Sequence, residues 1–140
     1  MARILIVDDE AETVALLAKA VRLLDHEPVA AYGCDEALAR IAEGLPDVIL
    51  LDLMMPEVDG FETMRRIRAL PEGGAVPIVV ITASQEADIL EKVARCGGNE
   101  VYRKPVGLDV LSEVIAAYVD SESPRWLSAT GSDLGWSLEQ

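Results

Sequence analysis

Short apolar runs alternate along this chain with segments whose apolar residues recur every three or four positions. Five of the runs are bounded by turn-forming residues and are too short for typical helices, so we interpret them as strands. They cover residues 3–7, 28–32, 48–52, 77–82 and 100–103. The run at 48–52 is apolar up to its last residue and predicts a fully buried strand.

Between these runs, apolar residues at helical spacing predict five helices. Two of the helices are expected to begin at a side-chain cap, the second at Asp35 and the fourth at Thr82 or Ser84. Glycine ends the same two helices, at Gly44 and at Gly97. The other three are expected over about residues 10–24, 61–70 and 107–119.

The regular alternation of strands and helices predicts the fold class. It is typical of a parallel sheet with right-handed crossovers and helices on both faces. We therefore expect an α/β, doubly wound five-stranded parallel sheet over residues 1–120, followed by a C-terminal tail over residues 121–140. The tail is rich in Ser, Thr and Gly but carries Trp126 and Trp136, so it is either a partly ordered extension or a segment that docks on the domain or a partner.

Composition narrows the classes of partner. The 140 residues include 12 Lys and Arg against 25 Asp and Glu, a formal net charge of −13. This argues against direct nucleic-acid binding, which depends on basic residues at phosphates. No apolar run approaches the roughly 18 residues of a membrane span, and the first strand leaves no room for a signal peptide. Cys34 and Cys96 lack a metal-binding spacing, so we expect a reduced, cytoplasmic protein without a membrane partner.

Polar residues end the apolar runs at the edge of the sheet where chemistry is expected. Asp8 and Asp9 follow the first run and Asp52 ends the third. Thr82 ends the fourth run, and Lys104 follows the fifth. In an open parallel sheet, ligands bind outside the carboxyl ends of the strands. We therefore expect these five side chains to form one site.

Three carboxylates packed together repel one another unless a cation compensates them. Oxygen ligands without a nearby His or Cys favour Mg²⁺. If a phosphoryl group is attached to Asp52, as in covalent catalysis by carboxylates, Mg²⁺ neutralises part of its charge. Lys104 and the Thr82 hydroxyl then contact its other oxygens, and the small side chain of Ala83 keeps the approach open.

The same residues carry a resemblance to a known family. They stand in this order: Asp8-Asp9, Asp52, Pro56, Gly60, Thr82-Ala83 and Lys104-Pro105. With this order and spacing, residues 2–120 resemble the receiver domain of two-component response regulators, the CheY-like superfamily. The resemblance implies a flavodoxin-like sheet with the strand order 2-1-3-4-5.

The resemblance also implies a role for each site residue. Asp52 is the phosphoacceptor and takes its phosphoryl group from a histidine kinase or a phosphotransfer protein. Asp9 binds Mg²⁺ directly and Asp8 largely through water, with Asp52 and the backbone carbonyl of Met54 as further ligands. Lys104 holds a phosphoryl oxygen. Phosphorylation shifts an equilibrium between inactive and active conformations.

In such a switch, Thr82, Ala83, Lys104 and Pro105 respond to the phosphoryl group, and the bond before Pro105 is cis, a form that is essentially restricted to proline. The output goes to a downstream protein partner that the sequence does not identify, and a homodimer is left open.

One position departs from the family pattern. Receivers usually carry Tyr or Phe three residues before the lysine, but here that residue is Val101 and the aromatic residue is Tyr102. Neighbouring strand residues face opposite sides of a sheet, so Tyr102 does not simply replace the usual switch aromatic. We expect it to pack under a helix.

Two other functions fit parts of the pattern. A receiver fold used as a scaffold without phosphorylation is consistent with Val101, although the complete acidic site argues against it. A Mg²⁺-dependent phosphatase resembling the haloacid dehalogenases, with an aspartyl-phosphate intermediate, needs its acid two residues after the nucleophile, where this chain has Met54. We therefore expect a signalling module and not an enzyme.

Overall fold

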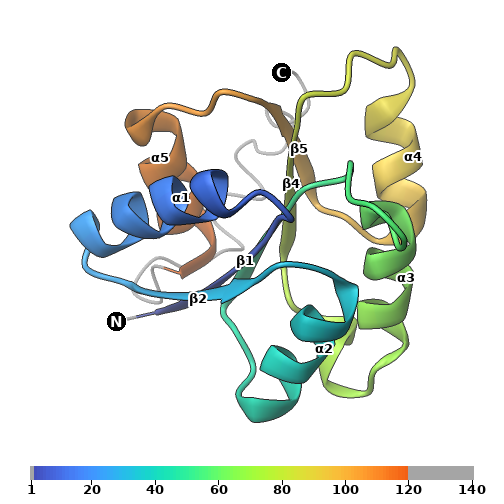
Figure 1. Cartoon of the computed structure of the whole chain (residues 1–140), viewed down its shortest axis with the longest axis horizontal. Coiled ribbons are helices and arrows are strands. Elements are labelled where there is room, and N and C mark those ends of the chain that lie inside the picture. The colour runs from blue at the N-terminus through green and yellow to red at the C-terminus, as the bar shows by residue number, and fades with distance from the viewer. Residues whose placement is uncertain (1, 120–140) are drawn as a thin grey trace.

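The computed structural model describes residues 2–119, so the predicted tail with Trp126 and Trp136 lies outside the described residues. Strands and helices alternate, as predicted, and a short 3₁₀ turn, η1 (Glu72–Gly74), precedes the fourth strand (Figure 1). The strands are β1 (Arg3–Val7), β2 (Glu27–Ala31), β3 (Val48–Leu51), β4 (Ile78–Thr82) and β5 (Glu100–Arg103). The helices are α1 (Ala11–Leu23), α2 (Cys34–Glu43), α3 (Gly60–Ala69), α4 (Ile89–Cys96) and α5 (Leu108–Val119).

The sheet is entirely parallel, with the order β2-β1-β3-β4-β5. This confirms both the predicted fold class and the predicted strand order. The chain first winds outward from β1 to β2 and then returns past β1 to β3. The winding direction therefore reverses between β1 and β3, and ligands of doubly wound sheets bind at such a reversal point.

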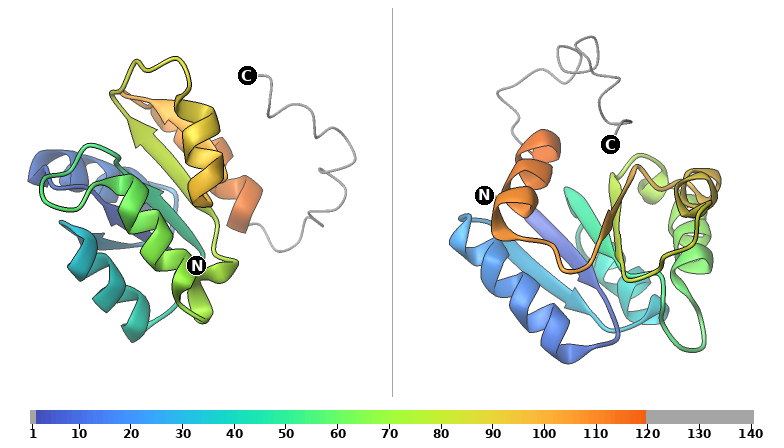
Figure 2. Two further views of the ribbon diagram at one scale, coloured as in Figure 1. Left: turned by 90° about the vertical axis from the view of Figure 1, so that its right-hand side faces the viewer. Right: turned by 90° about the horizontal axis from the view of Figure 1, so that it is seen from above.

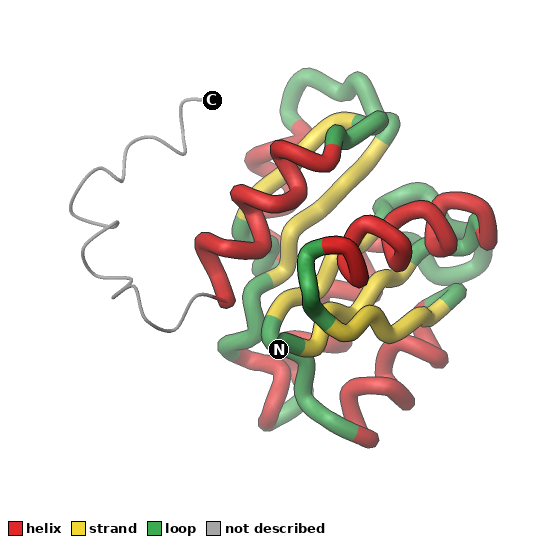
Figure 3. The backbone as a smooth tube through the Cα atoms, turned by 90° about the vertical axis from the view of Figure 1, so that its left-hand side faces the viewer, coloured by secondary structure: helices red, strands yellow, loops and turns green. Residues whose placement is uncertain are grey.

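Strand residues alternate between two cores, one on each face of the sheet. Leu5, Ile49 and Val80 pack with α2, α3 and α4, whereas Ile4, Leu50 and Ile81 pack with α1 and α5. Figure 2 (left) shows α3 and α4 in front of the sheet, and Figure 3, from the opposite side, shows α1 and α5. Because both faces are covered, the central strands β3 and β4 are buried along their whole length, which explains why β3 is an unbroken apolar run.

The predicted cap of α2 is wrong. The helix begins at Cys34, and the residue before it, Gly33, has extended backbone and makes no side-chain capping bond. Asp35 lies inside the first turn, where its negative charge is still favourable near the helix N-terminus. The next residue, Glu36, reaches back instead, and its Oε1 accepts a hydrogen bond of 2.9 Å from the Tyr32 N–H.

The predicted cap of α4 is also wrong, because the helix begins only at Ile89. Thr82 Oγ1 accepts from the Ser84 N–H at 3.1 Å, and Ser84 Oγ accepts from the Glu86 N–H at 3.2 Å. Such local side-chain bonds hold the backbone in turns and compete with helix formation. The loop between β4 and α4 is therefore longer than the pattern indicated.

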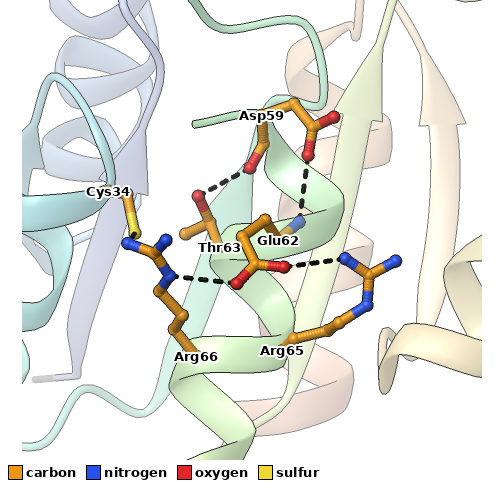
Figure 4. Close-up of polar contacts among 6 residues, drawn as sticks. All are labelled: Cys34, Asp59, Glu62, Thr63, Arg65 and Arg66. Atoms are coloured by element: carbon orange, nitrogen blue, oxygen red, sulfur yellow. Dashed lines mark hydrogen bonds and ion pairs between the residues drawn. The ribbon is translucent and has the colours of Figure 1, made fainter. Parts of the chain in front are cut away.

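A capped helix follows the β3–α3 loop and fixes its far end. Asp59 Oδ1 accepts a hydrogen bond of 3.0 Å from the Glu62 N–H, and the Thr63 hydroxyl donates to the Asp59 carbonyl at 2.8 Å (Figure 4). Glu62 then pairs with Arg65 at 2.9 Å and with Arg66 at 3.1 Å. These ion pairs are exposed and worth little individually, so the Asp59 cap is the stronger contribution to the start of α3.

Gly60, the first residue of α3, lies against the backbone of the residues that follow β3. A Cβ at Gly60 would lie 2.5 Å from the Asp52 carbonyl oxygen and 2.6 Å from the Leu53 Cα. We expect Gly60→Ala to lower the free energy of unfolding by about 2–3 kcal/mol, because backbone atoms must move to accommodate the methyl group. Urea denaturation measures this loss.

The matched control for that variant is Gly33→Ala. A Cβ at Gly33 meets no heavy atom within 4 Å, and the φ angle of −179° is extended backbone that alanine adopts. We expect Gly33→Ala to change the free energy of unfolding by no more than about 0.5 kcal/mol. A loss at Gly60 no greater than the loss at Gly33 would contradict the close contact with Asp52.

Candidate functional site

Two buried carboxylates lie side by side where β1 and β3 end. The Asp52 N–H donates to the Val7 carbonyl at 2.9 Å, which holds Asp52 beside the end of β1. The Asp8 N–H donates to the Ala31 carbonyl at 3.1 Å, which holds Asp8 beside the end of β2. Only 2% of Asp8 and 5% of Asp52 are exposed. Charged groups this deeply buried need partners.

A third carboxylate completes an acidic cluster. One carboxylate oxygen from each of Asp8, Asp9 and Asp52 lies within 4.8 Å of the other two. Asp9 is exposed, so the cluster opens to solvent on its side. Three oxygen donors at this spacing, with no nitrogen or sulfur donor among them, form a donor set that suits a hard divalent cation.

Lys104 supplies the positive charge at the two buried carboxylates. Its Nζ lies 2.9 Å from Asp8 Oδ2 and 3.5 Å from Asp52 Oδ1. The Lys104 N–H donates to the Thr82 carbonyl at 2.9 Å, which ties the end of β5 to the end of β4. The Lys104–Pro105 bond is cis, as the resemblance implied.

Sequence reasoning assigned Lys104 to a phosphoryl oxygen and did not anticipate its ion pair with Asp8. The two residues are 96 positions apart, so only the folded sheet brings them together. The signal in the sequence was a lysine directly after the last strand, at an edge of the sheet where three carboxylates were expected.

Burial and like charge raise the pKa of Asp52. Burial is the main cause and the negative charge of Asp8 is the second, while Lys104 and a backbone hydrogen bond from Met54 act in the opposite direction. For Lys104, burial lowers the pKa of the amine, but the hydrogen bond to Asp8 and the charges of Asp52 and Asp8 outweigh it, so its pKa is raised. The lysine therefore stays charged, and Asp52 carries an electrostatic penalty.

This penalty gives stability a definite pH dependence. A carboxyl whose pKa is raised on folding binds its proton more tightly in the folded state, so its cost is fully present above the folded pKa and is relieved as the pH falls through it. With metal removed by a chelator, Asp52→Asn is expected to be more stable than the wild type at about pH 7.5, by a margin that shrinks toward about pH 4.5. Urea denaturation at several pH values measures the margin, and a margin that widens on acidification would contradict the raised pKa.

Thr82 ends β4 and Ala83 follows it, whereas Met54 follows Asp52 in the segment after β3, the neighbouring strand. Thr82 is fully buried at the end of β4, the strand beside β3, and its Oγ1 accepts the Ser84 N–H. A hydroxyl that accepts one bond still has its own O–H to donate. Ala83 is exposed, and 62% of Met54 is exposed next to the acceptor candidate. A small and a flexible side chain, both exposed, therefore follow the ends of these two strands.

Val101 and Tyr102 face opposite sides of the sheet. Val101 packs with the α2–α4 core, whereas Tyr102 packs with the α1–α5 core, which confirms the expectation that it lies under a helix. The Tyr102 hydroxyl donates to Glu100 Oε1 at 2.6 Å, and the Tyr118 hydroxyl of α5 donates to the other oxygen of Glu100. Burial, together with Glu100, raises the pKa of Tyr102. Glu100 therefore joins β5 to α5 through two tyrosines.

Comparisons with known proteins agree on one family. The model of the response regulator receiver domain matches residues 4–116. The regulatory protein AtoC of Escherichia coli is 33% identical over 123 residues, which cover 88% of this chain and 26% of AtoC. The chain thus spans about a quarter of the length of that relative.

Solved structures show the same fold. The chemotaxis protein CheY4 of Vibrio cholerae superposes with a TM-score of 0.81 at 24% identity, covering 85% of this chain and 99% of CheY4. The receiver domain of the sensor histidine kinase PA1611 from Pseudomonas aeruginosa PAO1 superposes with a TM-score of 0.78 at 26% identity, covering 85% and 98%. That structure has a magnesium ion coordinated in its active site cleft. Within residues 2–119, no helix has the length and apolar character needed to cross a membrane.

Proposed function

The chain belongs to the response regulator receiver domain family, and we propose that it is the phosphoacceptor module of a two-component phosphorelay, with Asp52 as the acceptor. The observation that carries this proposal is the buried Asp52 carboxylate, 3.5 Å from the Lys104 amine and clustered with Asp8 and Asp9. A histidine kinase or a phosphotransfer protein is the proposed donor, and a downstream protein partner is the proposed recipient of the signal.

In this mechanism, Asp52 is the nucleophile. One of its carboxylate oxygens forms a bond to phosphorus while the phosphorus–nitrogen bond of the donor phosphohistidine breaks, and the histidine nitrogen leaves. The carboxylate must be charged to attack. Lys104 and the Met54 N–H favour this charged form, whereas burial and the charge of Asp8 raise the pKa of Asp52, so the amine and the backbone N–H offset part of that cost.

The donor set fits Mg²⁺, which the carboxylates of Asp8, Asp9 and Asp52 would hold together with the backbone carbonyl of Met54. When bound there, the ion neutralises part of the charge on the transferring group. The Lys104 amine lies 3.5 Å from Asp52 Oδ1, so it could bind an oxygen of a phosphoryl group on Asp52 after a small movement.

The proposed conformational switch begins when phosphorylation of Asp52 changes the contacts of Lys104 and Thr82. A phosphoryl group adds about 1.5 to 2 negative charges on Asp52. Reversing an equilibrium from 1:99 to 99:1 takes about 5.5 kcal/mol, whereas one charged hydrogen bond supplies roughly 1.5–3 kcal/mol. Lys104 and the Thr82 hydroxyl therefore act together in this proposal. The loop between β4 and α4 moves with them, because its Ser84 N–H donates a hydrogen bond to the Thr82 hydroxyl. Ala83 and Pro105 lie beside these two residues in the same switch region.

Intact mass tests the proposal. After incubation with acetyl phosphate and Mg²⁺, we expect the protein to gain one phosphoryl group, and the gain to be lost when the metal is chelated. Acetyl phosphate replaces the unidentified kinase, so the result depends only on this chain. Absence of any gain under conditions where Mg²⁺ binding is demonstrated would favour the scaffold function instead.

A further inference from the structure

An apolar groove of about 380 Å³ lies between α1 and the segment that leads from β5 into α5. Leu16 and Leu23 of α1 and Leu108 of α5 form part of its walls, and they are 70%, 66% and 47% exposed. The apolar stripe that α1 uses for the core is a different one, formed by Val14, Ala18 and Val21. The leucines are therefore extra apolar surface that folding of residues 2–119 leaves uncovered, as expected of a docking surface.

The groove also has a distinct charge. Lys19 lines it, together with Lys104, whose amine is paired with Asp8 at 2.9 Å, and none of its described lining residues is acidic. The chain as a whole has a formal net charge of −13, so the groove differs in charge from the average of the chain. The groove thus suits an apolar segment that carries negative charge.

A segment of this chain has that chemistry. Residues 120–140 contain both tryptophans of the protein, Trp126 followed by Leu127 and, later, Trp136. They also contain four Asp and Glu residues against one arginine. Tryptophan supplies a large apolar area per residue, so Trp126 and Leu127 form a compact apolar anchor.

The attachment point brings this anchor within reach. The segment follows Val119 at the end of α5, and α5 lies on the same face of the sheet as α1 (Figure 3). The groove adjoins the beginning of α5, and the 12 residues of that helix span about 18 Å. Trp126 is the seventh residue after Val119, and seven extended residues span about 23 Å. The chain is long enough to return along α5 and place Trp126 in the groove.

We propose that Trp126, with Leu127, docks in the groove between α1 and α5 of its own chain. This contact covers the exposed leucines and places the tail against Lys104 and Pro105, the residues that border the phosphoacceptor site. The proposal does not depend on the phosphoryl chemistry, because it rests on the apolar surface and the charge of the groove.

Tryptophan fluorescence tests the docking directly, since the tail holds both tryptophans. In the full chain with Trp136→Phe, Trp126 is the only reporter. We expect acrylamide to quench it much less than it quenches a synthetic peptide of residues 120–140 carrying the same change. Leu16→Gln combined with Leu23→Gln is expected to lower the ratio of docked to free tail by about tenfold or more, because burial of leucine surface is lost.

Leu90→Gln is the matched control. Leu90 is 53% exposed on α4, on the opposite face of the sheet, so its replacement should leave the quenching of Trp126 unchanged. Circular dichroism verifies that each variant is folded. If the double variant of Leu16 and Leu23 does not fold, Leu108→Gln serves as a second variant of the groove.

Three results would overturn the proposal. The first is quenching of Trp126 in the full chain equal to that in the peptide. The second is unchanged shielding in folded groove variants. The third is shielding that disappears on dilution together with a dimer seen by sedimentation, which would assign the groove to the tail of a second copy.

Discussion

Asp52→Asn is expected to abolish the gain of one phosphoryl group that the wild type shows after treatment with acetyl phosphate and Mg²⁺. The amide oxygen is neutral and a far weaker nucleophile than a carboxylate, so the covalent step cannot proceed at this position. The substitution keeps the size of the side chain and removes one of two like charges buried side by side, so the variant remains folded. Intact mass spectrometry measures the loss, which should be complete.

Asp47→Asn is the matched control because it makes the same chemical change at the opposite end of β3. Asp47 is exposed and its Oδ2 accepts a hydrogen bond of 2.8 Å from the Arg3 N–H, far from the acidic cluster. This variant should gain a phosphoryl group as the wild type does. If Asp52→Asn were phosphorylated equally well, the acceptor would have to be another carboxylate, with Asp8 and Asp9 the first to examine.

Lys104→Met is expected to destabilise the metal-free protein by about 3 kcal/mol at about pH 7.5. The substitution leaves Asp8 and Asp52 buried beside each other without the amine that now lies 2.9 Å and 3.5 Å from their oxygens. The loss should be smaller at about pH 5, where protonation of a carboxyl relieves the repulsion, and Mg²⁺ should recover part of it. Urea denaturation with and without Mg²⁺ provides both comparisons.

Lys92→Met is the matched control, because it shows how much stability is lost when a lysine outside the acidic cluster is replaced by methionine. Lys92 pairs with Glu86 at 3.2 Å, but both side chains are exposed, so its removal should cost little stability and should not respond to Mg²⁺. Equal losses in the two variants, or a Lys104→Met loss that Mg²⁺ leaves unchanged, would mean that the amine does not compensate the acidic cluster.

The sequence was sufficient for the fold and for the positions of the site residues because both depend on local patterns. A strand covered on both faces must be apolar, so β3 was visible as a run, and the first polar residue after it, Asp52, marked the edge of the sheet. The strand order and the individual roles came from the family resemblance and not from the pattern. Those roles remain proposals that the experiments above test.

What the sequence did not provide depends on tertiary contacts or on competition between local ones. The Arg68 guanidinium of α3, for example, donates to the Val76 carbonyl at 2.7 Å and to the Gly97 carbonyl at 2.7 Å, contacts that depend on the folded chain. The caps expected at Asp35 and Ser84 failed because other local hydrogen bonds were available to the same backbone. Which of these hydrogen bonds forms depends on small differences in free energy, which cannot be read from the pattern of residues.

The ion pair between Lys104 and Asp8 also has a consequence for biosynthesis. Asp8 is synthesised 96 residues before Lys104. Until Lys104 has been made, a growing chain that brings β1 and β3 together has no amine to compensate the repulsion between Asp8 and Asp52. The amine that compensates the two buried carboxylates is therefore synthesised only after the last strand, when most of the domain has already been made.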